Sequence, residues 1–308
     1  MLIPAFNQEV ERGGYAWWYL DAISEDGRHG LTLIAFLGSV FSPYYAWARA
    51  RGKGDPLAHC AINVALYGPS SRWCMTERSQ PVVTRTSDSL RIGPSGLNWH
   101  DNHLRIDISE RAAPLPRRIR GRIKVYPAIH AGNQVQLDPN GHHRWTPVFP
   151  SAQVDVSLTT PGLDWRGQGY LDHNAGSEPL EHGFQRWSWL RAATRSGPVV
   201  LYDTELKQGK SQTMALRFAN SGEMEPLPSP KAVALPHSRW GIARPTRSDN
   251  GRARLHATWE DTPFYARSLI GTQLLGERVT AVHESLSLQR FSAPWVRLLL
   301  PFRMPRRT

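Results

Sequence analysis

Cysteine is scarce in this sequence, and so are the motifs that hold metals or nucleotides. Only Cys60 and Cys74 occur among 308 residues, too few for a disulfide framework and without zinc-ligand spacing. The scarcity predicts a reduced, cytoplasmic compartment. No Gly-x-Ser-x-Gly elbow of a serine hydrolase is present, and Gly167-Gln-Gly169 lacks the third glycine of a dinucleotide site. We expect neither a metal nor a cofactor.

Long hydrophobic runs are also missing. Residues 31–48 carry no charge, but they are barely long enough for a spanning helix and contain Gly38 and Pro43. We expect a buried strand over residues 31–37 and an apolar loop over residues 38–48. The first residues lack the basic and apolar regions of a signal peptide, so none is expected.

Negative charge is in the minority. The chain has 37 Lys and Arg against 26 Asp and Glu, a net charge of +11, which permits a nucleic acid, an anionic membrane or no specific partner. The basic residues are scattered, and no nucleic-acid motif accompanies the clusters at residues 117–122 and 303–307. Such clusters are most often solvated faces, but the apolar residues 295–302 beside the second cluster are typical of an interfacial membrane contact. We expect peripheral membrane contact and no nucleic acid.

Short strands separated by turns dominate what is present. The 25 Gly and 24 Pro divide the chain into brief apolar segments. Residues 15–23 and 30–37 read as a hairpin around a turn at Gly27, and residues 103–109 alternate apolar with polar side chains, as a half-buried strand does. No segment reads as an amphipathic helix longer than two turns. The sequence predicts an all-β protein with few short helices.

An internal echo indicates two domains. Trp17-Trp-Tyr-Leu-Asp-Ala22 is similar to Trp187-Ser-Trp-Leu-Arg-Ala192, and each is followed by a turn and an apolar return strand. Chance similarity in a chain with 12 Trp is the alternative. We expect one β domain over residues 1–165 and a second over residues 166–308.

Polar groups gather between glycines at residues 167–176. If the segment is extended, Tyr170 and Asp172 point to one face. Burial of Asp172 in a glycine-flanked loop among aromatic residues would raise its pKa and make it a general acid, supported by His173. The alternative is a turn aspartate that binds backbone N–H groups. His142 and His143 point to opposite sides of an extended chain, which argues against a metal site.

The aromatic residues near the N-terminus allow two interpretations. They either line a long apolar ligand pocket or pack in the core, and core packing is the commoner case for any one of them. The members of this group are Tyr15, Trp17, Trp18, Tyr19, Tyr44, Tyr45 and Trp47.

Four segments together resemble one family. They are Tyr15-Ala-Trp-Trp-Tyr-Leu-Asp-Ala22, Phe36-Leu-Gly-Ser-Val-Phe-Ser-Pro-Tyr-Tyr45, His143-x-Trp145 and Gly169-Tyr-Leu-Asp-His-Asn-x-Gly176. The combination resembles the carotenoid 1,2-hydratases, or hydroxyneurosporene synthases, over nearly the whole chain. The resemblance implies two lipocalin-like antiparallel β-barrel or sandwich domains, with a ligand channel at or near their junction. It also implies a cofactor-independent hydro-lyase that adds water to the terminal C1=C2 bond of acyclic carotenoids such as neurosporene or lycopene.

The resemblance also implies roles for single residues. Asp172 matches the proton donor, Tyr170 its partner, and His143 and Trp145 the His-x-Trp pair. Protonation at C2 would give a tertiary cation at C1, stabilised by aromatic faces, and water would attack C1 with His143 holding it or accepting its proton. The residues expected to bind substrate are Trp17, Tyr19, Tyr44, Tyr45, Trp187, Trp189 and Asn174. The expected location is the cytoplasm of a photosynthetic bacterium, peripheral to the inner photosynthetic membrane.

Two other functions fit the same scaffold. One is a carrier of a long apolar ligand, which would have no use for an acid. The other is a cofactor-free terpenoid or polyketide cyclase, because a fold does not fix its chemistry.

Overall fold

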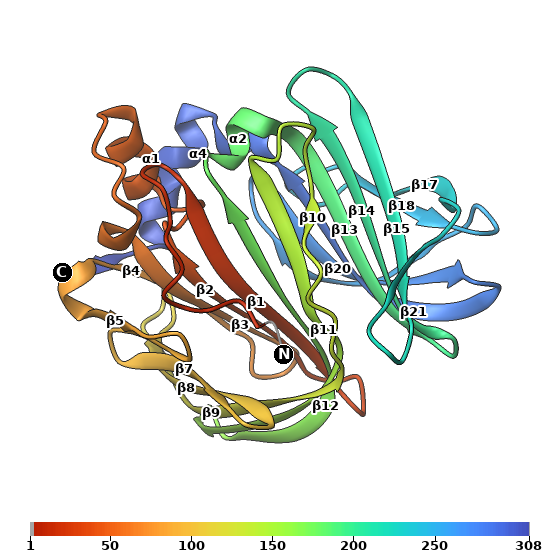
Figure 1. The fold of residues 1–308 in the computed structure, drawn as a ribbon, viewed down its shortest axis with the longest axis horizontal. Helices are drawn as coiled ribbons and strands as arrows, with labels where there is room; N and C mark the ends of the chain where they lie inside the picture. The colour runs from red at the N-terminus through yellow and green to blue at the C-terminus, as the bar shows by residue number, and fades with distance from the viewer. Residues whose placement is uncertain (1–2, 308) are drawn as a thin grey trace. The chain divides into compact units, whose positions relative to one another are not determined.

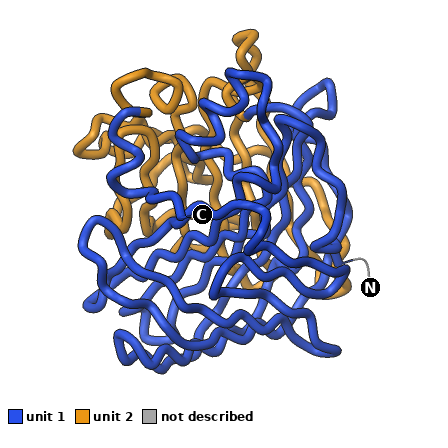
Figure 2. Tube along the Cα trace, turned by 90° about the vertical axis from the view of Figure 1, so that its left-hand side faces the viewer, with its two compact units in different colours: residues 1–179, 298–308 blue, residues 180–297 orange. Residues whose placement is uncertain are grey.

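The computed structural model describes residues 3–307 of the chain, and nearly all of its regular structure is antiparallel β-sheet (Figure 1). The described residues divide into two compact units, drawn in separate colours in Figure 2. Unit 1 contains residues up to 179 together with residues from 298 onward, and unit 2 contains residues 180–297. Each unit is built on its own sheet, as the all-β prediction requires.

Unit 1 is a 13-stranded curled sheet with the strand order β22-β4-β3-β2-β1-β12-β11-β9-β8-β7-β6-β5, and β10 pairs with β11. Its strands are β1 Tyr15–Ser24, β2 Gly30–Leu37, β3 Cys60–Tyr67, β4 Arg72–Arg78, β5 Val83–Arg85, β6 Ser89–Ile92, β7 Ser95–His100, β8 His103–Arg111, β9 Arg118–Ile129, β10 Val135–Gln136, β11 His143–Thr160, β12 Leu163–Gly176 and β22 Arg306–Arg307. All these pairs are antiparallel except β22 with β4, which returns the end of the chain to unit 1.

Alternation along β1 shows how unit 1 separates its two faces. Trp18 and Leu20 belong to the hydrophobic core inside the curled sheet, with apolar residues of β2, β3, β8, β9 and β11. Trp17, Tyr19 and Asp21 point to the opposite face because side chains alternate along a strand. All five side chains are buried, so both faces of this part of the sheet are covered.

Unit 2 has a seven-stranded antiparallel sheet with the order β16-β15-β14-β13-β21-β20-β19, and a separate pair β17-β18. Its strands are β13 Phe184–Thr194, β14 Gly197–Leu206, β15 Ser211–Phe218, β16 Met224–Pro226, β17 Lys231–Leu235, β18 Arg244–Ser248, β19 Arg254–Asp261, β20 Tyr265–Leu274 and β21 Glu277–Ser287. A small core of aliphatic side chains, including Leu190, Leu201 and Ile270, lies on one face of the larger sheet. The two hairpins predicted from the Trp-rich echo are therefore present as β1–β2 and β13–β14.

Helices are short, as predicted, but one of them replaces an expected loop. Residues 38–48 were expected to be a loop, and α1 Pro43–Ala50 begins inside them. The Ser42 hydroxyl accepts hydrogen bonds from the backbone N–H groups of Tyr44 and Tyr45, and proline at the first helical position favours helix initiation. The other helices are α2 Leu180–Gly183, α3 Leu288–Phe291, α4 Pro294–Leu299 and the 3₁₀ turns η1 Pro56–Ala58, η2 Gln80–Val82 and η3 Leu300–Phe302.

The division into units differs from the expected domain boundary. A boundary between residues 165 and 166 falls inside β12, which pairs with β1 and β11 as one continuous strand. The first unit consequently runs to residue 179, and the end of the chain rejoins it through β22. Within residues 3–307, no helix combines the length and the apolar character needed to cross a bilayer.

Candidate functional site

The glycine-rich segment 167–176 is the second half of a central strand. This corrects the expected loop: β12 lies between β1 and β11, and the segment is paired on both sides. Glycine serves close packing here, because a Cβ at Gly167 would lie 1.9 Å from the carbonyl oxygen of Ile23. A Cβ at Gly169 would lie 2.4 Å from Cγ2 of Val154. Small residues therefore let β12 pack tightly against both neighbours.

Strand register places the predicted catalytic side chains on one face. Asp172 is opposite Tyr19 of β1, and Asn174 is opposite Trp17 of β1 and Trp145 of β11. Opposed residues on paired strands point to the same face, so these side chains share the face opposite the core of unit 1. Tyr170, two residues before Asp172, lies on this face too, as predicted for an extended segment.

Asp172 is the centre of a buried hydrogen-bond network. Its Oδ2 accepts from the indole Nε1 of Trp145 at 2.9 Å and from the hydroxyl of Tyr170 at 2.8 Å. The same indole N–H lies 3.1 Å from the Tyr170 hydroxyl, and the Asn174 amide donates to Oδ1 at 3.1 Å. These four side chains are at most 3% exposed. The network orients the carboxyl and excludes bulk water from it.

His143 belongs to the same face but to a different part of it. It is opposite Gly176, four residues along β12 from Asp172, a backbone separation of about 13 Å at the usual rise per residue. Its Nδ1 is hydrogen-bonded to the Tyr15 hydroxyl at 2.9 Å, and Nε2 is 3.4 Å from Oε1 of Glu178. Burial lowers the pKa of His143, while the nearby carboxylates of Asp138 and Glu178 oppose that shift. A neutral imidazole is the expected form at neutral pH.

The turn before β11 fixes His143 in place. Oδ2 of Asp138 accepts the His143 backbone N–H at 2.6 Å, and its Oδ1 accepts the backbone N–H groups of Asn140 and His142. The turn sequence Asp138-Pro-Asn-Gly141 therefore caps the start of the strand that carries His143 and Trp145.

His173 does not support Asp172. The two residues are adjacent on a strand, so His173 points into the core of unit 1, where its ring lies 5.0 Å from that of Trp18. Its Nε2 contacts the side-chain amide of Gln8 at 2.5 Å. Burial lowers the pKa of His173 to about 3, so the ring is neutral at physiological pH.

Two of the predicted substrate-binding aromatic residues lie beside the acid. Trp17 stacks on Tyr15 with ring centroids 4.8 Å apart and meets Phe36 edge-on at 5.9 Å. Tyr19 is directly opposite Asp172, and its ring meets that of Tyr170 edge-on at 6.3 Å. These rings form an aromatic wall next to the carboxyl.

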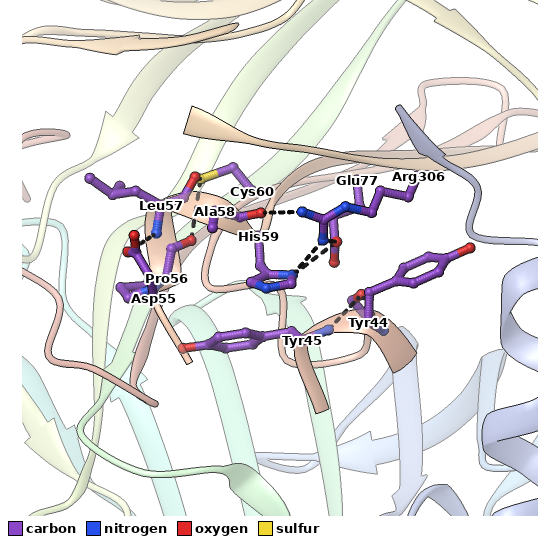
Figure 3. Close-up of polar contacts among 11 residues, drawn as sticks. Tyr44, Tyr45, Asp55, Pro56, Leu57, Ala58, His59, Cys60, Glu77 and Arg306 are labelled. Atoms are coloured by element: carbon purple, nitrogen blue, oxygen red, sulfur yellow. Dashed lines mark hydrogen bonds and ion pairs between the residues drawn. The ribbon is translucent and has the colours of Figure 1, made fainter. Parts of the chain in front are cut away.

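Tyr44 and Tyr45 lie in a different cluster, on α1 (Figure 3). The Tyr45 ring packs against His59 at 5.0 Å, and its hydroxyl donates to the carbonyl oxygen of Gly14 at 2.6 Å. His59 contacts the buried Glu77, which also accepts from Arg306 of β22. His59 Nδ1 lies 2.9 Å from Oε1 of Glu77 and 2.8 Å from Nη1 of Arg306, so the three side chains form one cluster. Tyr45 thus helps to anchor the chain terminus.

The remaining two predicted aromatic residues belong to unit 2. Trp187 and Trp189 are both on β13 and both buried. Trp187 also borders a cavity of about 610 Å³ within unit 2, between the larger sheet and the β17–β18 pair.

On the face that carries Asp172, sequence reasoning missed Asp21 and gave Tyr15 no role beyond membership of the aromatic group. Tyr15 holds His143, and Asp21 is a second, fully buried carboxyl opposite Tyr170. A signal for Asp21 was available, because the tripeptide Tyr-Leu-Asp occurs at residues 19–21 and again at residues 170–172. Among the residues described, no group of three or more His, Cys, Asp or Glu side chains is arranged to hold a metal ion.

Comparison with known proteins gives matches along the whole chain. Residues 33–308 match the family model of the carotenoid hydratase CrtC. The acyclic carotenoid 1,2-hydratase of Thiocapsa roseopersicina is 55% identical over 306 residues, covering 98% of this chain and 76% of that protein. The acyclic carotenoid 1,2-hydratase of Rubrivivax gelatinosus is 46% identical over 309 residues, covering 99% of this chain and 76% of that protein.

A solved structure shares the fold. The putative AttH protein of Nitrosomonas europaea superposes with a TM-score of 0.58 at 14% identity, covering 93% of this chain and 99% of that one. At this identity the likeness concerns the fold alone, which is lipocalin-like, as predicted.

Proposed function

The chain belongs to the carotenoid hydratase family and hydrates acyclic carotenoids, and we propose that Asp172 supplies the proton for this reaction. It is therefore a hydro-lyase, and neither the apolar carrier nor the terpenoid or polyketide cyclase is needed to explain the chain. The observation that supports Asp172 is its burial within a network of three side-chain donors on a face rich in aromatic rings.

The proton is best placed on Oδ1 of Asp172. Oδ2 already accepts from Trp145 and Tyr170, whereas Oδ1 faces only the Asn174 amide among these neighbours. The Oδ1 atom of Asn174 is buried without a hydrogen-bond partner. Rotation of this amide by 180° lets Asn174 accept the O–H of a protonated Asp172, and it moves the amide N–H groups to the position that the oxygen occupies now.

The chemistry follows from the alkene. Asp172 transfers its proton to C2 of the terminal C1=C2 bond, which leaves a tertiary cation at C1. The aromatic rings of Trp17 and Tyr19, on the same face as Asp172, would stabilise that cation. Water then forms a bond to C1 and loses a proton, giving the tertiary alcohol. His143 is hydrogen-bonded to Tyr15, which stacks on Trp17, so its role is to hold this aromatic wall.

Substitution of the acid tests this proposal. Asp172→Asn keeps the size and most hydrogen bonds of the side chain but cannot donate a carboxylic proton. We expect turnover of acyclic carotenoids to fall by about 10²–10⁴-fold, the usual range for a general acid. Asp164→Asn is the matched control, since Asp164 is an exposed carboxylate on the same strand. Both variants should still bind carotenoid, as measured by the quenching of Trp fluorescence. Retained turnover in Asp172→Asn would exclude Asp172 as the proton donor.

We also propose that the enzyme contacts the membrane that holds its substrate, from the cytoplasmic side. Leu298 and Phe302 are 67% and 75% exposed, and Arg303 follows them directly. Exposed apolar side chains beside basic ones are typical of interfacial contact. The double variant Leu298→Ser with Phe302→Ser should bind less to vesicles of anionic phospholipid in a sedimentation assay than the parent does. Leu115→Ser, at a 62% exposed site, is the control. Equal sedimentation of the double variant and the parent would refute this contact.

A further inference from the structure

Two copies of one tripeptide are paired in unit 1, and their Tyr and Asp side chains lie on the face of the sheet that carries Asp172. Tyr19-Leu20-Asp21 lies in β1 and Tyr170-Leu171-Asp172 in β12, and the two strands are antiparallel neighbours. The register pairs Tyr19 with Asp172, Leu20 with Leu171, and Asp21 with Tyr170. Each aspartate therefore faces the tyrosine of the other strand, in a local two-fold arrangement.

The leucines fix this arrangement. Leu20 and Leu171 belong to the hydrophobic core, on the face away from the carboxyls. A one-residue shift of either strand would move its leucine out of the core, so the pairing is strongly specified. Asp21 and Asp172 are then diagonal neighbours on one face, about 7–8 Å apart at their backbone positions.

Asp21 is as deeply buried as the acid itself. It is 0% exposed, and its Oδ2 lies 3.4 Å from the Tyr19 hydroxyl. On its other side it is opposite Thr32 of β2, whose hydroxyl accepts from Tyr67 at 3.3 Å. Asp21 thus places a second carboxyl, a group able to accept a proton, on the same buried face as Asp172.

We propose that Asp21 is the base that removes a proton from the attacking water. This inference rests on the proposed function of Asp172. In the first step the π electrons of C1=C2 take the proton of Asp172, which becomes a carboxylate. The oxygen of water then bonds to the cation at C1 while its proton passes to the Asp21 carboxylate.

Tyr170 links the two acids for the next turnover. It is opposite Asp21, and its hydroxyl donates to Oδ2 of Asp172. A proton from Asp21 reaches Oδ2 of Asp172 when Tyr170 accepts it and passes its own onward, and rotation about the Cβ–Cγ bond of Asp172 brings it to the Oδ1 position. Atoms and charge then balance over the cycle, since the alkene gains one H and one OH from a single water and both carboxyls return to their starting forms.

A solvent-isotope experiment separates the two roles. In D₂O, Asp172 exchanges its proton and delivers deuterium to C2. In Asp21→Asn, capture of the cation by water is slow, and the cation instead returns a proton from C2 or from a C1 methyl group to the Asp172 carboxylate. We expect at least a 100-fold loss of hydrated product, while the unhydrated carotenoid recovered by extraction gains deuterium. Mass spectrometry of both fractions measures these changes.

The control variants make each outcome decisive. Asp172→Asn should show neither hydration nor deuterium, Asp164→Asn should match the parent, and Asp21→Glu should recover part of the hydration. Quenching of Trp fluorescence by bound carotenoid establishes that each variant is folded. Loss of hydration without deuterium in Asp21→Asn would overturn the role of Asp21 as base. Full hydration by Asp21→Asn would do the same and leave the proposed function intact. Deuterium gain in Asp172→Asn instead would exchange the two roles and overturn both assignments.

Discussion

The buried imidazole of His173 makes the stability of unit 1 depend on pH. His173 is 3% exposed and lies in the core, and burial lowers its pKa to about 3. In the unfolded chain its pKa returns to about 6.5. Between these values the unfolded state binds a proton that the folded state does not. The stabilisation is therefore complete above about pH 6.5 and is lost as the pH falls towards 3.

The size of the effect follows from these two pKa values. The pKa of His173 is about 6.5 in the unfolded chain and about 3 in the folded protein. Proton linkage through His173 alone therefore makes the folded state about 2 kcal/mol less stable at pH 5.0 than at pH 7.5. His173→Leu removes the titrating group and places an apolar side chain beside Trp18. The variant loses the contact with the half-buried Gln8, which lowers its stability equally at both pH values.

Urea unfolding at pH 7.5 and pH 5.0 measures the prediction. The free energy of unfolding of the parent should fall between the two pH values by about 2 kcal/mol more than that of His173→Leu. Because each protein is compared with itself at the two pH values, any pH-independent cost of the substitution cancels. Hydration activity at pH 7.5 should persist, because His173 points away from Asp172. If the free energy of unfolding changed equally between the two pH values in parent and variant, the assignment of a neutral, buried His173 would be refuted.

Other substitutions test the network, the strand packing and the chain terminus. Trp145→Phe removes the indole donor to Asp172, and kcat should fall about 10–100-fold with carotenoid binding retained; an unchanged kcat would contradict this. Gly169→Ala places a Cβ against Val154 and should cost about 1–3 kcal/mol in urea unfolding, part of which Val154→Ala restores. Arg306→Met leaves the buried Glu77 with His59 alone and should cost about 2 kcal/mol (Figure 3). Adding Glu77→Gln should recover much of that loss, and no recovery would show that the charge of Glu77 is not the cause.

Local patterns were sufficient for much of the fold. The turn at Gly27 between two apolar runs gave the β1–β2 hairpin, and alternation over residues 103–109 gave β8, because both signals depend on near neighbours in the chain. The shared face of Tyr170 and Asp172 also followed from spacing alone. The contact of Trp145 with Asp172 was beyond such reasoning, since it depends on the register of β11 against β12.

Long-range pairing explains what the sequence did not predict. Glycines at residues 167–176 favoured a loop, whereas in the structure they relieve crowding against Ile23 and Val154, residues distant in the chain. The pairing of β22 with β4 joins segments more than 200 residues apart and depends on the buried Glu77. As an aromatic residue Tyr45 fits a ligand pocket equally well, and its contact with His59 is visible only in the structure.

The hydrogen bonds to Asp172 also explain how a carboxylic acid can protonate an alkene, which is a weak base. Burial favours the neutral acid, whereas the donors on Oδ2 favour the carboxylate. Before transfer, Trp145 and Tyr170 meet an uncharged oxygen and bind it weakly. As the proton leaves Oδ1, negative charge grows on the carboxyl and both hydrogen bonds strengthen. Interactions that are stronger in the transition state than in the ground state are the ones that accelerate a reaction. The role of Trp145 and Tyr170 is therefore to make the proton of Asp172 easier to release at the moment when the cation forms.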